Sequence, residues 1–139
     1  MSKVYHFERK QIIKTNLNAA WEFIRNPLNL NKITPPNMVF KILSEVPPNM
    51  FEGLLISYKI KIPLIGEQDW VSELKHIKEK HSFVDEQLIG PYKLWYHYHQ
   101  ITDTPNGVEF LDKITYSIPY GIIGELARLL YVKNQLNNI

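Results

Sequence analysis

The sequence predicts an α+β domain in which a curved antiparallel sheet of about seven strands wraps around a long C-terminal helix. Three observations lead to this prediction. Turn residues separate short segments of high β-propensity at regular intervals from position 38 to position 118. A short helical segment precedes these strands, and apolar residues recur at helical spacing from position 120 onward. A long meandering sheet must curve and cover its apolar face, and the C-terminal helix is the large apolar element available for that purpose.

The N-terminal part is predicted to contain one strand followed by two short helices. Asn16 is a suitable cap for a helix over Leu17–Ile24, and Pro27 ends that helix or opens the second one. About six strands follow, separated by Pro-, Gly- and Asn-containing turns. The sequence ends within the C-terminal helical pattern without a Gly or Pro stop, so we expect the helix to extend past residue 139.

Composition fits a single globular domain over residues 1–139. Apolar residues make up 45% and charged residues 22%, which excludes a disordered or collagen-like chain. A net charge of +2 lacks the basic stripe of a nucleic-acid binder, and the absence of Cys excludes a disulfide scaffold, a thiol nucleophile and a thiolate zinc site. Apolar stretches fall short of the ~20 residues of a membrane helix, and the charged start at Met1–Glu8 lacks a signal-peptide core. We therefore expect a cytoplasmic protein without stable membrane insertion.

Strand alternation predicts which side chains face the interior. Ile56, Tyr58 and Ile60 share one face of their strand, whereas Lys59 and Lys61 share the other face, which must be solvated. Antiparallel pairing carries this inward parity through each hairpin. The further inward residues are then Trp70, Ser72, Leu74, Phe83, Asp85, Gln87, Trp95, His97, His99, Ile101, Val108, Phe110, Asp112, Ile114 and Tyr116.

This predicted interior is half aromatic and half hydrogen-bonding, unlike an ordinary filled core. Apolar walls with a few convergent polar groups are typical of a ligand pocket. The polar tips outnumber the inward acceptors, so we expect a cavity of ~300–1,000 Å³; the alternative is a fully satisfied polar network that only specifies the fold. The predicted ligand-binding residues are Tyr58, Trp70, Ser72, Phe83, Gln87, Trp95, His99, Phe110 and Tyr116 on the sheet, with Ile122, Leu126 and Leu130 on the helix.

Three segments carry a family resemblance that covers nearly the whole chain. Trp21–Glu22–Phe23 followed by residues 29–38 resembles the opening of START-like helix-grip proteins, the SRPBCC superfamily. The runs Phe83–His99 and Gly107–Gly121 are similar to the same group, in particular to its small bacterial ligand-binding and polyketide-cyclase-like members. The resemblance implies a seven-stranded sheet that grips a long C-terminal helix, with a cavity between them. It leaves the activity open, because this fold hosts lipid carriers, hormone receptors and cyclases.

His97 is the centre of the candidate chemistry. If the hairpins close at the predicted turns, Asp85 lies directly opposite His97 on one side and Asp112 lies near it on the other. Carboxylates on both sides would hold the imidazole protonated or raise its pKa. The three residues could act as acid and base on a bound carbonyl compound or anchor the polar end of a ligand. The alternative is a buried, mutually neutralised ladder that organises the sheet.

Metal binding is the other chemistry that these residue types permit. His97, His99, Asp85 and Asp112 are all possible ligands, but a His-x-His strand with flanking carboxylates is common, and no matching cluster lies elsewhere in the sequence. We therefore expect no metal and no cofactor.

Several aromatic and apolar residues are predicted to lie outside the interior. Tyr92, Tyr96 and Tyr98 have outward parity and are predicted to pack beneath the N-terminal strand or at an interface such as that of a homodimer. Stacking on single-stranded nucleic acid would need a basic groove that the sequence lacks. Met50 and Phe51 in a turn suggest a pocket rim, a lid or a membrane-touching edge, or they cover the end of the helix.

The sequence thus favours a protein that binds a small hydrophobic or aromatic molecule with a polar end. The second hypothesis is an enzyme of cyclase or dehydratase type that uses His97 with Asp85 or Asp112 as acid and base. The third is a lipid carrier, which would need an apolar rim and a long, narrow cavity.

Overall fold

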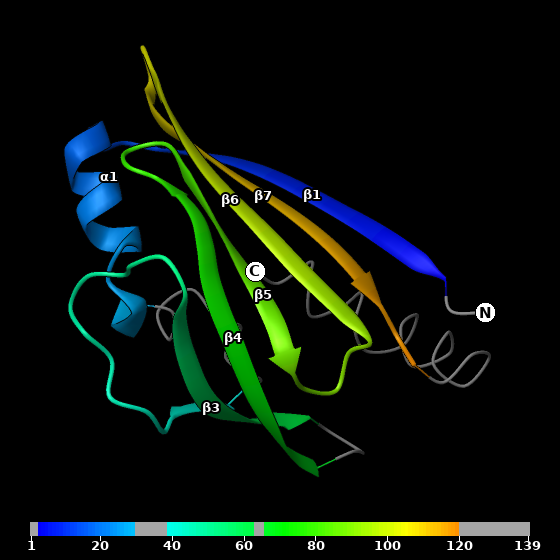
Figure 1. The fold of residues 1–139 in the computed structure, drawn as a ribbon. Coiled ribbons are helices and arrows are strands. Elements are labelled where there is room, and N and C mark those ends of the chain that lie inside the picture. The colour runs from blue at the N-terminus through cyan, green and yellow to red at the C-terminus, as the bar shows by residue number, and fades with distance from the viewer. Residues whose placement is uncertain (1–2, 30–38, 63–65, 120–139) are drawn as a thin grey trace.

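The computed structural model describes residues 3–29, 39–62 and 66–119 (Figure 1). Seven strands form one antiparallel sheet in the order β1-β7-β6-β5-β4-β3-β2, which confirms the predicted sheet. The C-terminal helix that was predicted to fill the curve of the sheet lies outside the described residues. The elements in chain order are β1 (Val4–Ile13), α1 (Leu17–Ile24), the 3₁₀ turn η1 (Pro27–Asn29), β2 (Val39–Ile42), β3 (Leu54–Ile62), β4 (Gly66–Lys78), β5 (Ser82–Ile89), β6 (Leu94–Thr104) and β7 (Gly107–Ser117).

The helix α1 begins and ends at the predicted residues. The Asn16 side chain accepts a hydrogen bond from the Ala19 backbone N–H at 2.8 Å and so caps the helix. A second short α-helix was predicted after it, but the residues described there form the single 3₁₀ turn η1. The Asn26 side chain accepts from the Leu28 N–H at 3.0 Å and stabilises this tight turn.

The sheet twists and curves strongly, and α1 lies at one end of it near β6 (Figure 1). The predicted inward parity is confirmed along the central strands, since Ile56, Trp70, Ser72 and Leu74 are all buried. On the opposite face, Lys59 forms ion pairs with exposed acidic residues of β4. The concave face of the sheet is therefore the face that carries the candidate site.

The outer face departs from the alternation at four buried positions, which are Ser82, Val84, Leu111 and Ser117. Val84 is buried although it has outward parity, because its register partners Lys75 and Tyr98 flank it with long side chains. Leu111 on β7 is buried in the same way between its neighbours on β6 and β1. Ser117 was expected on the solvated face but is buried, and its carbonyl accepts a hydrogen bond from the Lys93 N–H in the turn before β6.

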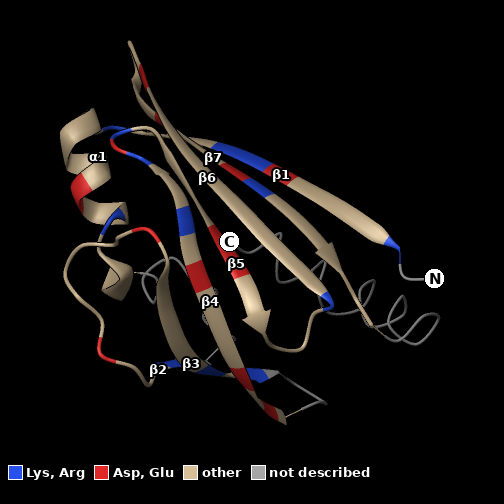
Figure 2. Ribbon diagram, viewed as in Figure 1, with Lys and Arg blue, Asp and Glu red and all other residues tan. Residues whose placement is uncertain are grey.

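Along β4 the acidic residues Glu67, Asp69 and Glu73 come first and the basic residues Lys75 and Lys78 follow at its end (Figure 2). Among the residues that the structure describes, no helix combines the length and the apolar character needed to cross a bilayer. The cytoplasmic location stays a prediction. Tyr96 and Tyr98 lie on the outer face of β6 as expected, and the homodimer also stays a prediction.

Candidate functional site on the concave face of the sheet

Four ionisable side chains from three neighbouring strands meet on the concave face. Asp85 comes from β5, His97 and His99 from β6, and Asp112 from β7, and we call these four residues the histidine–aspartate cluster. Asp85 pairs in register with His97, as predicted, and His99 pairs with Asp112. The two imidazole rings stack with their centroids 3.7 Å apart. Strand alternation and hairpin closure are therefore sufficient to assemble the cluster.

Each ring nitrogen in this cluster faces a carboxylate oxygen. His97 Nε2 lies 2.9 Å from Asp112 Oδ1, and His97 Nδ1 lies 3.7 Å from Asp85 Oδ2. His99 Nε2 lies 2.5 Å from Asp85 Oδ2, and His99 Nδ1 lies 3.2 Å from Asp112 Oδ1. Both carboxylates thus contact both imidazoles. The short hydrogen bond to Asp85 comes from His99, the diagonal neighbour, rather than from its register partner His97.

These contacts fix the charge of His99. Burial alone would lower the pKa of His99, but hydrogen bonds to Asp112 and Asp85, together with their charges, raise it to about 9. Burial would raise the pKa of Asp112, yet hydrogen bonds from His97 and His99 hold that pKa well below its usual range. Burial is likewise outweighed at Asp85, whose pKa is lowered chiefly by His97 and then by His99. The predicted position of His97 between two carboxylates is confirmed, and His99 shares the same two carboxylates.

Asp85, His97 and His99 offer ligand atoms that all lie within 4.8 Å of one another. These are residue types that bind transition metals. A metal would have to displace the proton that the two carboxylates hold on His99, so its binding would be strongly pH-dependent. The expectation that this protein functions without a metal ion stays a prediction.

Beside this cluster the concave face is aromatic. Trp95 on β6 lies 5.6 Å from Trp70, 4.7 Å from Tyr92 and 6.1 Å from Tyr116, measured between ring centroids. Tyr5 of β1 stacks on Tyr116 at 5.5 Å. We call these five residues the aromatic cluster.

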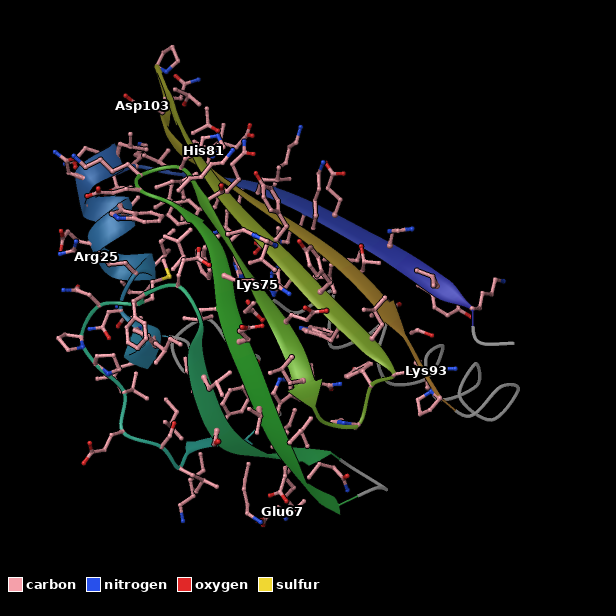
Figure 3. The ribbon with its side chains drawn as sticks, in the orientation of Figure 1. Arg25, Glu67, Lys75, His81, Lys93 and Asp103 are labelled. Atoms are coloured by element: carbon pink, nitrogen blue, oxygen red, sulfur yellow. The ribbon has the colours of Figure 1, made fainter. Side chains whose placement is uncertain are left out.

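Tyr92 was missing from the predicted site. It was assigned to the outer face by extending the parity of β6 backwards, but residues 90–93 form a bend before the strand begins. Gln87 holds this bend: its Nε2 donates to the Tyr92 carbonyl at 2.6 Å, and the Tyr92 N–H donates to its Oε1 at 3.1 Å. In Figure 3, Lys93 marks this turn, and His81 marks the turn at the other end of the sheet. Gln87 was predicted to contact a ligand, but both functions of its amide are bonded to this turn.

Ser72 satisfies two of the polar groups that were expected to need a ligand. Its Oγ lies 2.8 Å from the Tyr58 hydroxyl and accepts from Trp70 Nε1 at 2.9 Å. All three residues are buried. Tyr58, Trp70 and Gln87 therefore find protein partners for their polar groups, and the prediction that these groups need a ligand is wrong. The cavity itself stays a prediction, because Ile122, Leu126 and Leu130, which would close it, lie outside the described residues.

The remaining predicted residues lie on the same face. Phe83 stacks on His99 with ring centroids 4.4 Å apart, and Phe110 packs against the core. Met50 packs against the core as well and donates its N–H to the Arg25 carbonyl at 2.8 Å, whereas Phe51 remains exposed. Of these two residues, only Phe51 is therefore exposed enough to form a rim or lid.

Arg9 is a second residue of this face that lies outside the predicted site. Along β1, Tyr5, Phe7 and Arg9 are half-buried, while the residues between them are exposed. Arg9 pairs in register with Asp112, so parity places it on the concave face. The alternation of Tyr5 and Phe7 with polar residues was the signal that could have found it.

Comparison with known proteins identifies the fold. No protein-family model and no curated protein matches the sequence. Among solved structures, TTHA0849 from Thermus thermophilus is similar with a TM-score of 0.70 and 13% identity, covering 96% of this chain and 88% of that one. Ginseng major latex-like protein 151 from Panax ginseng has a TM-score of 0.63 and 15% identity, covering 96% and 95%. StfQ, a di-domain ARO/CYC from the steffimycin biosynthetic pathway, has a TM-score of 0.67 and 14% identity, covering 97% of this chain and 48% of StfQ. The chain therefore shares the helix-grip fold of these proteins, which is the fold that the resemblance of its motifs implied.

Proposed function

We propose that the concave face of the sheet binds a small hydrophobic or aromatic molecule. The aromatic cluster holds the body of the ligand, and the histidine–aspartate cluster orients its polar end. The observation that carries this proposal is that the two clusters are contiguous: Trp95 and His97 are successive inward residues of β6, and their ring centroids lie 6.4 Å apart. Proteins of this fold typically bind hydrophobic ligands, which supports the same conclusion.

Fluorescence titration with 1-anilinonaphthalene-8-sulfonate tests the proposal. We expect saturable binding that Trp95→Leu weakens roughly tenfold, because the indole would supply the central aromatic contact. Tyr98→Leu is the matched control, since it removes an aromatic side chain from the outer face of the same strand and should leave the affinity unchanged. Non-saturable fluorescence, or equal affinities for both variants, would overturn the proposal.

An enzyme of cyclase or dehydratase type is the second candidate. This candidate is favoured because His97 contacts both Asp85 and Asp112. His97 and one of these carboxylates could serve as acid and base. In a dehydration, a base takes the proton on the carbon next to a carbonyl, a C=C bond forms, and the neighbouring hydroxyl leaves with a proton as water.

This candidate can be tested with a 3-hydroxyacyl thioester, whose loss of water is followed by ultraviolet absorbance. Turnover that His97→Asn abolishes, with probe affinity kept within about threefold, would establish the enzyme. Absence of turnover by the unaltered protein would leave binding as the function.

A further inference from the structure

One buried polar atom on the concave face is unexplained by the function proposed so far. Within the described part of the chain, Nη1 of Arg9 is buried and has no hydrogen-bond partner. A buried donor without an acceptor is costly, and native structures leave few such groups without a reason. A guanidinium group raises that cost because it stays charged. Arg25 Nε and Ser117 Oγ are the other such atoms among the described residues, but Arg25 lies at the end of α1 and Ser117 has outward parity on β7.

The neighbours of Arg9 do not satisfy it. Arg9, Asp112 and His99 form one cross-strand row over β1, β7 and β6. The carboxylate nearest in register is that of Asp112, but its Oδ1 is bonded to both histidines. No ion pair joins Arg9 to a carboxylate anywhere in residues 3–29, 39–62 and 66–119. Oδ1 of Asp112 thus serves the two histidines, and in this part of the chain no hydrogen bond or ion pair links Arg9 to this carboxylate.

An apolar path leads from the aromatic cluster to this guanidinium group. Tyr5 and Phe7 precede Arg9 on the same face of β1. Tyr5 stacks on Tyr116, and both Tyr5 and Phe7 pack against the core formed by Ile114 and Tyr116. A ligand lying along these rings would reach Arg9 with its end.

We propose that Arg9 binds an oxygen acceptor at the polar end of the aromatic ligand. This rests on the proposed function and names the chemistry that it requires. A guanidinium group donates two parallel hydrogen bonds to a carboxylate or sulfonate, and it also donates to a ketone carbonyl. The ligand is therefore an aromatic acid or an aromatic ketone rather than a plain hydrocarbon or an amine.

Three fluorescent probes with a naphthalene body distinguish these cases. 1-Anilinonaphthalene-8-sulfonate carries an anionic acceptor, 6-propionyl-2-dimethylaminonaphthalene carries a ketone, and N-phenyl-1-naphthylamine carries no oxygen. Arg9→Met should weaken binding of at least one oxygen-bearing probe about tenfold or more, with the larger loss for the sulfonate if the ligand is an acid. The same change should leave N-phenyl-1-naphthylamine within twofold.

Lys10→Met is the matched control, because it removes the neighbouring positive charge from the exposed face of β1. It should change none of the three affinities. Equal binding of both oxygen-bearing probes by the unaltered protein and by Arg9→Met would overturn the assignment of Arg9 while leaving the binding function intact. Failure of all three probes to bind the unaltered protein would instead refute the proposed function.

Thermal unfolding without any probe gives a second readout that does not depend on the ligand. Met keeps most of the apolar volume and removes the unpartnered donor, so Arg9→Met should unfold at the same temperature or a few degrees higher. A clear fall of the midpoint relative to Lys10→Met would show that Arg9 has a structural partner and would overturn the proposal.

Discussion

Replacing Ser72 by alanine should destabilise the protein well beyond what the loss of one small hydroxyl suggests. Ser72 is 2% exposed, and its Oγ is shared by the Tyr58 hydroxyl and the Trp70 indole N–H. Leaving a buried polar group without its partner costs about 1–3 kcal/mol. The Tyr58 and Trp70 rings lie 6.0 Å apart, so the two groups can recover part of the loss by bonding to each other. We therefore expect Ser72→Ala to lower the free energy of unfolding by about 2 kcal/mol.

Urea unfolding followed by far-ultraviolet circular dichroism measures this change. Ser57→Ala is the control, since it removes a serine hydroxyl from the outer side of β3 and should cost less than about 0.5 kcal/mol. In combination with Tyr58→Phe, which removes one of the two dependent groups, the cost of Ser72→Ala should shrink by about 1 kcal/mol. A Ser72→Ala variant as stable as the Ser57→Ala control would refute the shared hydrogen bonding.

Three further outcomes follow from the structure. The pKa of His99 is raised to about 9, compared with ~6.5 in the unfolded chain. Protonation of His99 therefore contributes about 3 kcal/mol to the free energy of unfolding below pH ~6.5, and this contribution is lost as the pH rises through about 9. Urea unfolding at a series of pH values should show this loss, and the His99→Gln variant should not show it. Gly107→Ala should lower the free energy of unfolding by about 2 kcal/mol or more, because φ is +132° and the new Cβ would clash with the Ile13 carbonyl oxygen. Gly53→Ala is the control and should lower it less, because φ is +82° there but no atom lies near the new Cβ. Equal melting temperatures of the two variants would contradict this expectation. Asn16→Ala should cost about 1 kcal/mol through loss of the α1 cap, measured in the same unfolding assay, and an unchanged stability would show that the cap is dispensable.

The placement of the site could be predicted from alternation because pairing in an antiparallel sheet preserves the face. Ile56 and Lys59 fix the parity of β3, and three hairpins carry it to Asp85 and His97 without further information. The pairing of β1 with β7 preserves the face in the same way and places Arg9 beside Asp112.

The pattern of hydrogen bonds could not be predicted in this way. Register gives straight cross-strand partners, but sheet twist brings diagonal neighbours within reach, so Asp85 bonds most closely to His99 rather than to His97. Whether one serine hydroxyl bonds to two neighbouring side chains depends on side-chain rotamers, which strand periodicity does not determine. Tyr92 lies before the first residue of β6, where alternation has no meaning.

The pairing of β1 with β7 has a consequence for how the site is assembled. Hairpins between consecutive strands bring Asp85, His97, His99 and Asp112 together, so these contacts close short loops. β1 joins residues that are far apart in the chain, such as His6 and Thr115, which are 109 positions apart. Pairings of such long range are slow to form, and Arg9 can reach its place only through this one. A chain that has formed its hairpins but has not yet docked β1 would already present aromatic surface without the guanidinium group. If Arg9 selects the ligand as proposed, we expect that selection to arise only once β1 has paired with β7.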